Sequence, residues 1–228
     1  MEEPVMLRHI SRALIGLLAL SLFGVIGCGD SSVEGSSAPQ AQLAFVHSLQ
    51  GLSDVSVLIN GELFIELEAG ELTTPKSLPP ETVTIEIESA GRVLDSLTTS
   101  LDLKAQLYLV GLTGVIDQGT SSVWVVDQEP DPAEEGFHQL EVVNLRTDGI
   151  AFNVFAGTSP IAMSPEAKAV SDFVAIEAGD AVISLTLAES GAPVAIGEEQ
   201  TFSDSGASMI IVSGDGPEDF TLQILDVR

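Results

Sequence analysis

Side chains that commonly do chemistry in proteins are few in this chain, apart from its carboxylates. The sequence contains a single cysteine, Cys28, three histidines, and 34 aspartates and glutamates. His9 lies near the N-terminus, so His47 and His138 are the histidines of the remaining chain. A zinc or copper site built from histidine and cysteine needs about three or four such ligands. We therefore expect no catalytic residues, no His- or Cys-rich metal site and no cofactor.

Nucleophilic catalysis by serine finds little support in the sequence. Gly29-Asp30-Ser31 resembles the nucleophile block of some lipolytic hydrolases, but a nucleophile needs a neighbouring base on a rigid framework. The block lies in a polar, non-periodic stretch, and no G-x-S-x-G turn occurs elsewhere. His47 follows an apolar segment, and we expect it to be a structural residue that caps a turn. We expect His138 to mark the entry into a second domain.

The residues that precede Cys28 predict a chemical modification of its thiol. Residues 1–12 end in basic side chains, and residues 13–26 form an apolar run. This run is shorter than the roughly 20 residues of a membrane-spanning helix, and the pattern is typical of a secretory signal peptide at 1–27. The run ends in Val25-Ile26-Gly27-Cys28, which resembles the lipobox of bacterial lipoproteins.

The resemblance implies cleavage between Gly27 and Cys28, with Cys28 as the lipid-attachment residue that carries palmitate-like acyl chains. The protein would then be lipid-anchored in the cell envelope. Gly29 favours the outer membrane if the source has two membranes. An ordinary cleavage site beside a free cysteine is the alternative, and the sequence leaves open whether Met1 or Met6 is the start.

Acidic residues dominate the charge of the chain, which is −26 at neutral pH. Such a surface repels phosphate backbones, so we expect no nucleic-acid partner. A chain with one cysteine cannot form an intramolecular disulfide, and its stability must therefore come from packing.

Composition divides the chain after the signal peptide into four segments. The stretch that follows Cys28 is small and polar, which is typical of a flexible tether. A second break is rich in proline and acidic residues and predicts an extended linker. The predicted segments are a tether at 28–40, a first β domain at 41–128, an acidic linker at 129–136 and a second β domain at 137–228.

Strand patterns fill both predicted domains. Apolar and polar residues alternate at 83–88 and 183–187, a period of two that indicates strands. Asn60-Gly61 lies between two apolar segments and favours the positive φ angles of a tight hairpin turn. Continuous apolar runs at 107–110 and 209–212 are suited to central strands.

The two halves repeat these patterns in the same order. Segments 43–46 and 140–143 correspond at an offset of 97, 83–87 and 183–187 at 100, and 107–110 and 209–212 at 102. We predict an all-β protein with two tandem immunoglobulin-like antiparallel β-sandwich domains. A single large β domain is the alternative. One helical turn is expected at 164–170.

The first half resembles an uncharacterised extracellular family known as domain of unknown function 4397, which often occurs in tandem. The residues that carry the resemblance are Leu43-Ala44-Phe45-Val46-His47-Ser48 and Asp54-Val55-Ser56-Val57-Leu58-Ile59-Asn60-Gly61. The second half has Asn144 where His47 falls and lacks the Asn-Gly turn. Because the family has no established activity, the resemblance implies fold and location but no chemistry.

These observations favour a non-enzymatic binding or structural module with an envelope protein or polymer as its partner. A carboxylate-based extracellular hydrolase is one alternative, since two acids at the right separation suffice for glycoside hydrolysis. A calcium-stabilised spacer or adhesion module is another, with acidic stretches at 127–135 and 214–219 as candidate ligands. Neither stretch has the spacing of a known calcium loop, so a solvated acidic surface is the preferred interpretation.

Overall fold

A computed structural model describes residues 40–102, 107–214 and 219–227 of the chain. The predicted signal peptide at 1–27, the lipid-attachment residue Cys28 and all but the last residue of the predicted tether lie outside the described residues. Within the described ranges, no helix is both long and apolar enough to cross a membrane.

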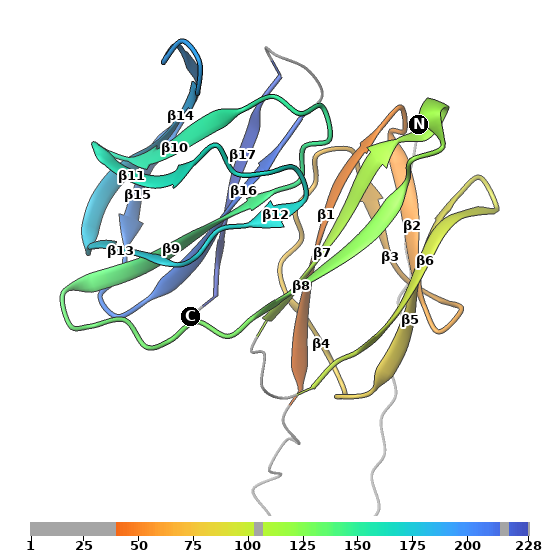
Figure 1. The fold of residues 1–228 in the computed structure, drawn as a ribbon. Helices are drawn as coiled ribbons and strands as arrows, with labels where there is room; N and C mark the ends of the chain where they lie inside the picture. The colour runs from red at the N-terminus through yellow and green to blue at the C-terminus, as the bar shows by residue number, and fades with distance from the viewer. Residues whose placement is uncertain (1–39, 103–106, 215–218, 228) are drawn as a thin grey trace, which may run out of the picture. The chain divides into compact units, whose positions relative to one another are not determined.

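Strands form the regular structure of the described residues, apart from one short 3-10 helix, η1 (Ile116–Gln118). The first half of the chain forms two four-stranded sheets (Figure 1). Sheet A has the order β4 (Lys76–Leu78), β1 (Ala41–Gln50), β7 (Leu107–Val115) and β8 (Ser122–Gln128). Sheet B has the order β3 (Glu62–Glu68), β2 (Asp54–Ile59), β5 (Thr82–Ser89) and β6 (Arg92–Ser100).

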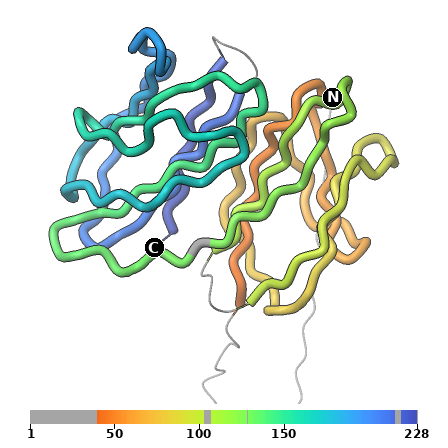
Figure 2. Tube along the Cα trace, in the orientation of Figure 1, coloured from red at the N-terminus to blue at the C-terminus, as the bar shows by residue number. Residues whose placement is uncertain are grey.

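The second half repeats this strand order, and the trace can be followed in Figure 2. Sheet C has the order β12 (Ala169–Val170), β9 (Phe137–Asn144), β16 (Ala207–Ser213) and β17 (Thr221–Asp226), and β13 (Val174–Glu177) also pairs with β9. Sheet D has the order β11 (Ser159–Met163), β10 (Phe152–Ala156), β14 (Gly179–Leu187) and β15 (Pro193–Phe202). The predicted all-β fold class is therefore confirmed.

Two of the strand pairs are parallel, which corrects the expectation of purely antiparallel sheets. Strand β1 runs parallel to β7 with Phe45 opposite Val110, and β9 runs parallel to β16 with Val142 opposite Ile210. The partners are far apart in sequence, and alternation along one strand looks the same for either direction of its neighbour. Strands in parallel pairs are commonly buried on both faces, as these four are.

Each half encloses an apolar core between its two sheets. In the first half Phe45 of sheet A packs with Val57 and Ile85 of sheet B, all fully buried. In the second half Leu140 of sheet C packs with Phe152 of sheet D in the same manner. The in-and-out alternation of the strands directs these side chains inward.

A third apolar core lies between the outer faces of sheets A and C. Val46 and Leu109 contribute to it from sheet A, and Met209 and Ile211 from sheet C, each with no exposed surface. Strands β1, β7, β9 and β16 are therefore covered on both faces, which explains the continuous apolar runs in their sequences. The described residues fall within one compact unit. The division into two immunoglobulin-like domains stays a prediction.

Of the two turns predicted from local sequence, one is confirmed and one is wrong. Asn60 and Gly61 have φ angles of 54° and 80° and connect β2 to β3, so the predicted hairpin is confirmed. The helical turn expected at 164–170 is wrong. Ser164 and Lys168 have φ angles of 50° and 52°, in the left-handed region that interrupts a helix, and the segment ends in β12.

The internal repeat is present with a corrected register. Ile87 lies opposite Val57, and Leu185 lies opposite Val154, the equivalent of Val57 at the offset of 97. Ile87 and Leu185 are therefore equivalent, at an offset of 98 instead of 100 (185 − 87). A slip of two residues keeps every side chain on its own face of the sheet, so alternation in the sequence cannot detect it.

Close packing between sheets A and C predicts a cost for any side chain at Gly111. A methyl group there would lie 2.8 Å from Leu145 Cδ2. We expect Gly111→Ala to lower the free energy of unfolding by about 1–3 kcal/mol, as overpacking does. Chemical denaturation of Gly111→Ala, Leu145→Val and the double variant measures the coupling. We expect Gly111→Ala to cost less in the Leu145→Val background, and equal costs in both backgrounds would rule out this contact.

Candidate functional site

A hollow of about 600 Å³ opens at the end of sheet B where β2 begins and where β3 and β5 end. Five carboxylates lie among its lining residues, and most of them are exposed to solvent. They are Asp54, Glu66, Glu68, Glu71 and Glu88. The hollow therefore gathers several carboxylates around one concave surface.

The strand register explains why the acids share one surface. Asp54 lies directly opposite Glu68, and Ser56 lies between Glu66 on β3 and Glu88 on β5. Like charges opposite one another destabilise a sheet. The negative charge of these carboxylates also means that the hollow repels anions and favours cationic contacts. In the described ranges, no three or more His, Cys, Asp or Glu side chains are grouped so that they could hold a metal ion.

His47 lies near the hollow but is buried, with 1% of its surface exposed. Its Nδ1 accepts a hydrogen bond of 3.1 Å from the backbone N–H of Leu49, so the ring proton is on Nε2. Nε2 has no hydrogen-bond partner among the described residues. Burial lowers the pKa of His47, while the nearby charges of Asp54 and Glu71 act to raise it. The expected role of His47 as the cap of a turn is wrong, because the ring bonds to the backbone within β1, which continues to Gln50.

Asn144 has the same role at the equivalent position of the second half. Its Oδ1 accepts a hydrogen bond of 3.0 Å from the backbone N–H of Arg146. Its amide nitrogen donates to the carbonyl oxygens of Pro165 and Glu166, at 3.0 and 2.9 Å. The replacement of histidine by asparagine therefore keeps the acceptor for the backbone N–H two residues onward and adds a link to the loop between β11 and β12.

His138 belongs to a buried polar network that links three strands. Its Nδ1 is 2.8 Å from the carbonyl oxygen of Ser203, and its Nε2 is 2.9 Å from Ser208 Oγ. Ser208 Oγ donates in turn to Asp226 Oδ1 at 2.7 Å. A methyl group at Gly206 would lie 2.7 Å from His138 Nδ1, so only glycine fits beside the ring. His138 does stand at the start of the second half, as the second residue of β9.

The order of these contacts differs from that of a catalytic Ser-His-Asp triad. In a triad the histidine lies between serine and aspartate, and the serine is accessible to substrate. Here Ser208 lies between His138 and Asp226, and Ser208 is fully buried. The imidazole nitrogen that would face an aspartate is instead directed at a backbone carbonyl. The network stabilises the pairing of β9, β16 and β17.

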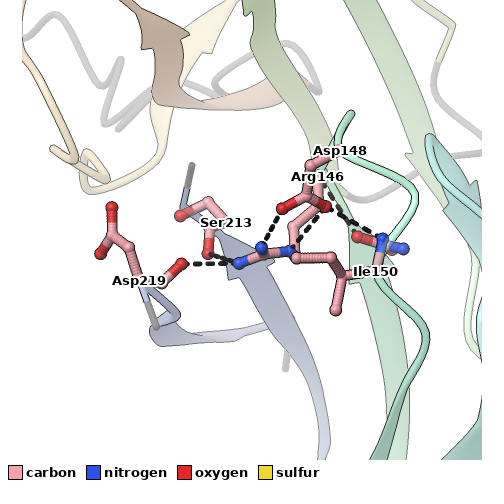
Figure 3. A network of polar contacts seen from close by, with 6 residues as sticks. Arg146, Asp148, Ile150, Ser213 and Asp219 are labelled. Carbon is pink, nitrogen blue, oxygen red and sulfur yellow. Dashed lines mark hydrogen bonds and ion pairs between the residues drawn. The ribbon is translucent and has the colours of Figure 1, made fainter. Parts of the chain in front are cut away.

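A second buried network surrounds Arg146, which is 1% exposed (Figure 3). Its guanidinium forms an ion pair with Asp148 and donates to the carbonyl oxygens of Asp219, at 2.6 Å, and Ser213, at 3.5 Å. The guanidinium carbon lies 3.7 Å from the centroid of the Phe220 ring, a cation–π contact. A buried charge needs such compensation, and Arg146 thereby joins the segment after β9 to the residues between β16 and β17.

Several predicted site residues lie outside the described residues, and others lie apart from one another. Gly27 and Cys28 are outside them, and so are residues 215–218 of the second acidic stretch. The acids of the predicted linker at 129–136 are exposed, and the Gly136 N–H donates to Asp204 Oδ1 at 2.7 Å. The structure does not bring the two acidic stretches together in one described cluster.

Sequence reasoning missed the Arg146 and His138 networks. Arg146 directly follows a segment at 140–145 that is apolar except for Glu141 and Asn144, and a basic residue in such a position is a usable signal for a buried ion pair. Ser208 gave no signal, because serine is common on strands and in loops alike. Its partners come from strands that are close only in the fold.

No protein-family model matches the chain, and a comparison with curated proteins finds no similar sequence. The resemblance of residues 43–61 to the domain of unknown function 4397 therefore stays a prediction.

Burial of His47 predicts a loss of stability in mild acid. The unfolded state binds a proton at the ordinary pKa of 6.5, whereas the folded state resists protonation because its pKa is lowered. The contribution is present above pH 6.5 and is lost as the pH falls through the lowered value of the folded state, at up to about 1.4 kcal/mol per pH unit. Urea denaturation between about pH 8 and about pH 5.5 measures the loss.

His47→Asn is the matched control, because Asn144 already has this role in the second half. We expect the variant to fold and to lose less stability than the wild type over the same pH interval. Parallel pH profiles for the two proteins would contradict the prediction.

Proposed function

We propose that this protein is a lipid-anchored cell-envelope protein whose body is a non-enzymatic binding or structural module. The observation that carries the proposal is the position of Cys28 directly after a signal-like apolar run and Gly27. Acyl chains on this cysteine would hold the protein at a membrane, and the polar stretch at 28–40 would separate the body from it.

The finer description of the body is a tandem pair of immunoglobulin-like sandwiches. Tyr108 supports it: its hydroxyl accepts a hydrogen bond of 2.8 Å from the backbone N–H of Asp102. Immunoglobulin-like domains often contain such a tyrosine, whose hydroxyl bonds to backbone a few residues upstream. Burial also raises the pKa of Tyr108. The resemblance to immunoglobulin-like domains is limited to the arrangement of two packed sheets. The strand order differs, because the parallel pairs of β1 with β7 and β9 with β16 are not part of a regular immunoglobulin strand order.

The buried polar groups form hydrogen bonds within the protein, and this supports a binding or structural role. His138, Ser208 and Arg146 donate and accept within the protein and hold strands and loops in place. The apolar core between sheets A and C joins the halves into a stiff body. Such a body is suited to present its outer faces to an envelope protein or polymer at a distance from the membrane.

The acid-lined hollow of sheet B is the basis for two alternative functions, a hydrolase and a calcium-binding module. Its carboxylates could serve a hydrolase, although Asp54, Glu66 and Glu68 are exposed, whereas a glycosidase keeps its general acid in a desolvated pocket. They could also bind calcium weakly. Glu88→Gln tests both alternatives. Loss of a chromogenic-glycoside activity in this variant would support the hydrolase, and loss of a calcium-induced rise in melting temperature would support the calcium site.

Lipid attachment is tested by growing the producing bacterium with radiolabelled palmitate. We expect label in the wild-type protein, none in Cys28→Ala, and normal label in the control Ser31→Ala, because only the thiol can take the diacylglycerol. The labelled protein should sediment with membranes, and its mass should lack residues 1–27. Unlabelled protein that retains those residues would contradict the proposal.

A further inference from the structure

A groove of about 490 Å³ is lined by residues of β11, the end strand of sheet D, and of β12 and β13 of sheet C. Its lining residues are apolar apart from Glu166, Ser171 and Asp172. Met163 is 62% exposed and Val170 is 36% exposed, so apolar side chains of the groove remain in contact with solvent. A concave apolar surface with a few polar groups at its rim is typical of a binding site.

The first half has larger side chains at the positions equivalent to the floor of the groove. Ala162 is the equivalent of Ile65 at the offset of 97, because the two residues pair with equivalent residues of β10 and β2. Ile161, which precedes Ala162 at an irregularity of the pairing, is in the same way the equivalent of Phe64. The second half therefore leaves space where side chains of the chain itself fill the first half.

A cation and an aromatic ring close this side of the first half. The ring of Phe64 packs on Phe45 with 5.6 Å between the centroids, and Lys76 Nζ lies 5.7 Å from the centroid of Phe64. The latter distance is within the range of cation–π contacts. Val174 occupies the position of Lys76 in the second half, because the two residues pair with equivalent residues of β9 and β1. The groove thus lacks both the ring and the cation at these positions.

The backbone at the edge of the groove is suited to an extended segment. Ser164 donates its backbone N–H to the carbonyl oxygen of Phe152 on β10, at 2.9 Å. Because backbone groups alternate in direction along a strand, the N–H and C=O of Met163 point away from β10, toward the open edge of sheet D. An extended peptide can bind such an edge through main-chain hydrogen bonds while one of its side chains enters the neighbouring groove.

Charge narrows the choice of the segment. Glu166 and Asp172 are exposed at the rim of the groove, and the net charge of the chain is −26. A basic segment is therefore attracted and an acidic one repelled. The stretch at 28–40 of the chain itself contains neither an aromatic nor a basic residue, and a second copy brings the same negative charge. The occupant that fits is a segment of a different protein.

We infer that the groove binds an extended segment of a partner protein that presents an aromatic side chain beside a lysine or arginine. The ring enters the groove in the manner in which Phe64 fills the first half, and the basic residue lies near Glu166 and Asp172. The inference rests on the binding role proposed above and adds the chemistry of the partner.

Titration of the purified full chain with a fluorescent peptide tests the inference. The probe is acetyl-Thr-Val-Lys-Phe-Lys-Val-Thr-amide, and the control peptide has alanine in place of phenylalanine, so that its charge is unchanged. Fluorescence anisotropy measures binding. We expect saturable binding of the phenylalanine peptide and binding about tenfold or more weaker for the alanine peptide, because the groove buries the ring.

Two variants that copy the first half should close the groove. Val174→Lys introduces the cation of Lys76, and Ala162→Ile introduces the larger side chain of Ile65. We expect each to weaken binding of the phenylalanine peptide by about tenfold or more. Val93→Lys is the matched control, because it makes the same change at a 49% exposed position of sheet B and should bind nearly as the wild type does. Melting temperatures identify any variant that fails to fold.

Equal binding of the two peptides, or equal effects of Val174→Lys and Val93→Lys, would show attraction by charge alone and overturn the inference. Binding of lauric acid in preference to the peptide, or self-association that Val174→Lys abolishes, would assign the groove to a different occupant and overturn it as well. Palmitate labelling of Cys28 scores the lipid anchor separately, so failure of the groove to bind the peptide is distinguishable from failure of the anchor.

Discussion

Burial of the central strands on both faces is the constraint on which this structure depends. Strands β1, β7, β9 and β16 each have a core on one side and the contact between sheets A and C on the other. A buried polar side chain on either face costs free energy unless it finds a partner inside the protein. This requirement accounts for apolar segments without alternation. It also accounts for Gly111, where Leu145 leaves no room for a side chain, and for Thr113, whose hydroxyl donates to the Leu145 carbonyl at 2.9 Å.

The two halves share a common strand framework and differ mainly on the outer faces of their sheets. His47 and Asn144 both accept a hydrogen bond from the backbone N–H two residues onward, so different side chains make the same contact at equivalent positions. The outer faces have diverged further, with Glu86 in the first half and Ser184 in the second. Positions inside the framework are fixed by packing, whereas positions on outer faces are free to take on contacts.

The sequence predicted the strands well because alternation and turn residues are local signals. The hairpin at Asn60-Gly61 and the order of repeated segments followed from them. Local signals do not encode which distant strands become neighbours, so the parallel pairing of β1 with β7 and the contact between sheets A and C were not predicted. The same limit hid the network of His138 and Ser208, whose residues are 70 positions apart in sequence. Cys28 lies outside the described residues, and its role still rests on sequence.

The apolar contact between sheets A and C also opposes separation of the two halves. Ten apolar side chains of the described residues are buried there, and burial of one large aliphatic side chain contributes about 1.5–3 kcal/mol. The gross contribution of this core is therefore larger than the net stability of a typical domain, about 5–15 kcal/mol. Separation of the halves would expose this surface without any disulfide to limit unfolding, since the chain has one cysteine. The acidic segment at 129–136 therefore connects two halves that are already joined by a buried apolar contact, and it does not act as a free hinge.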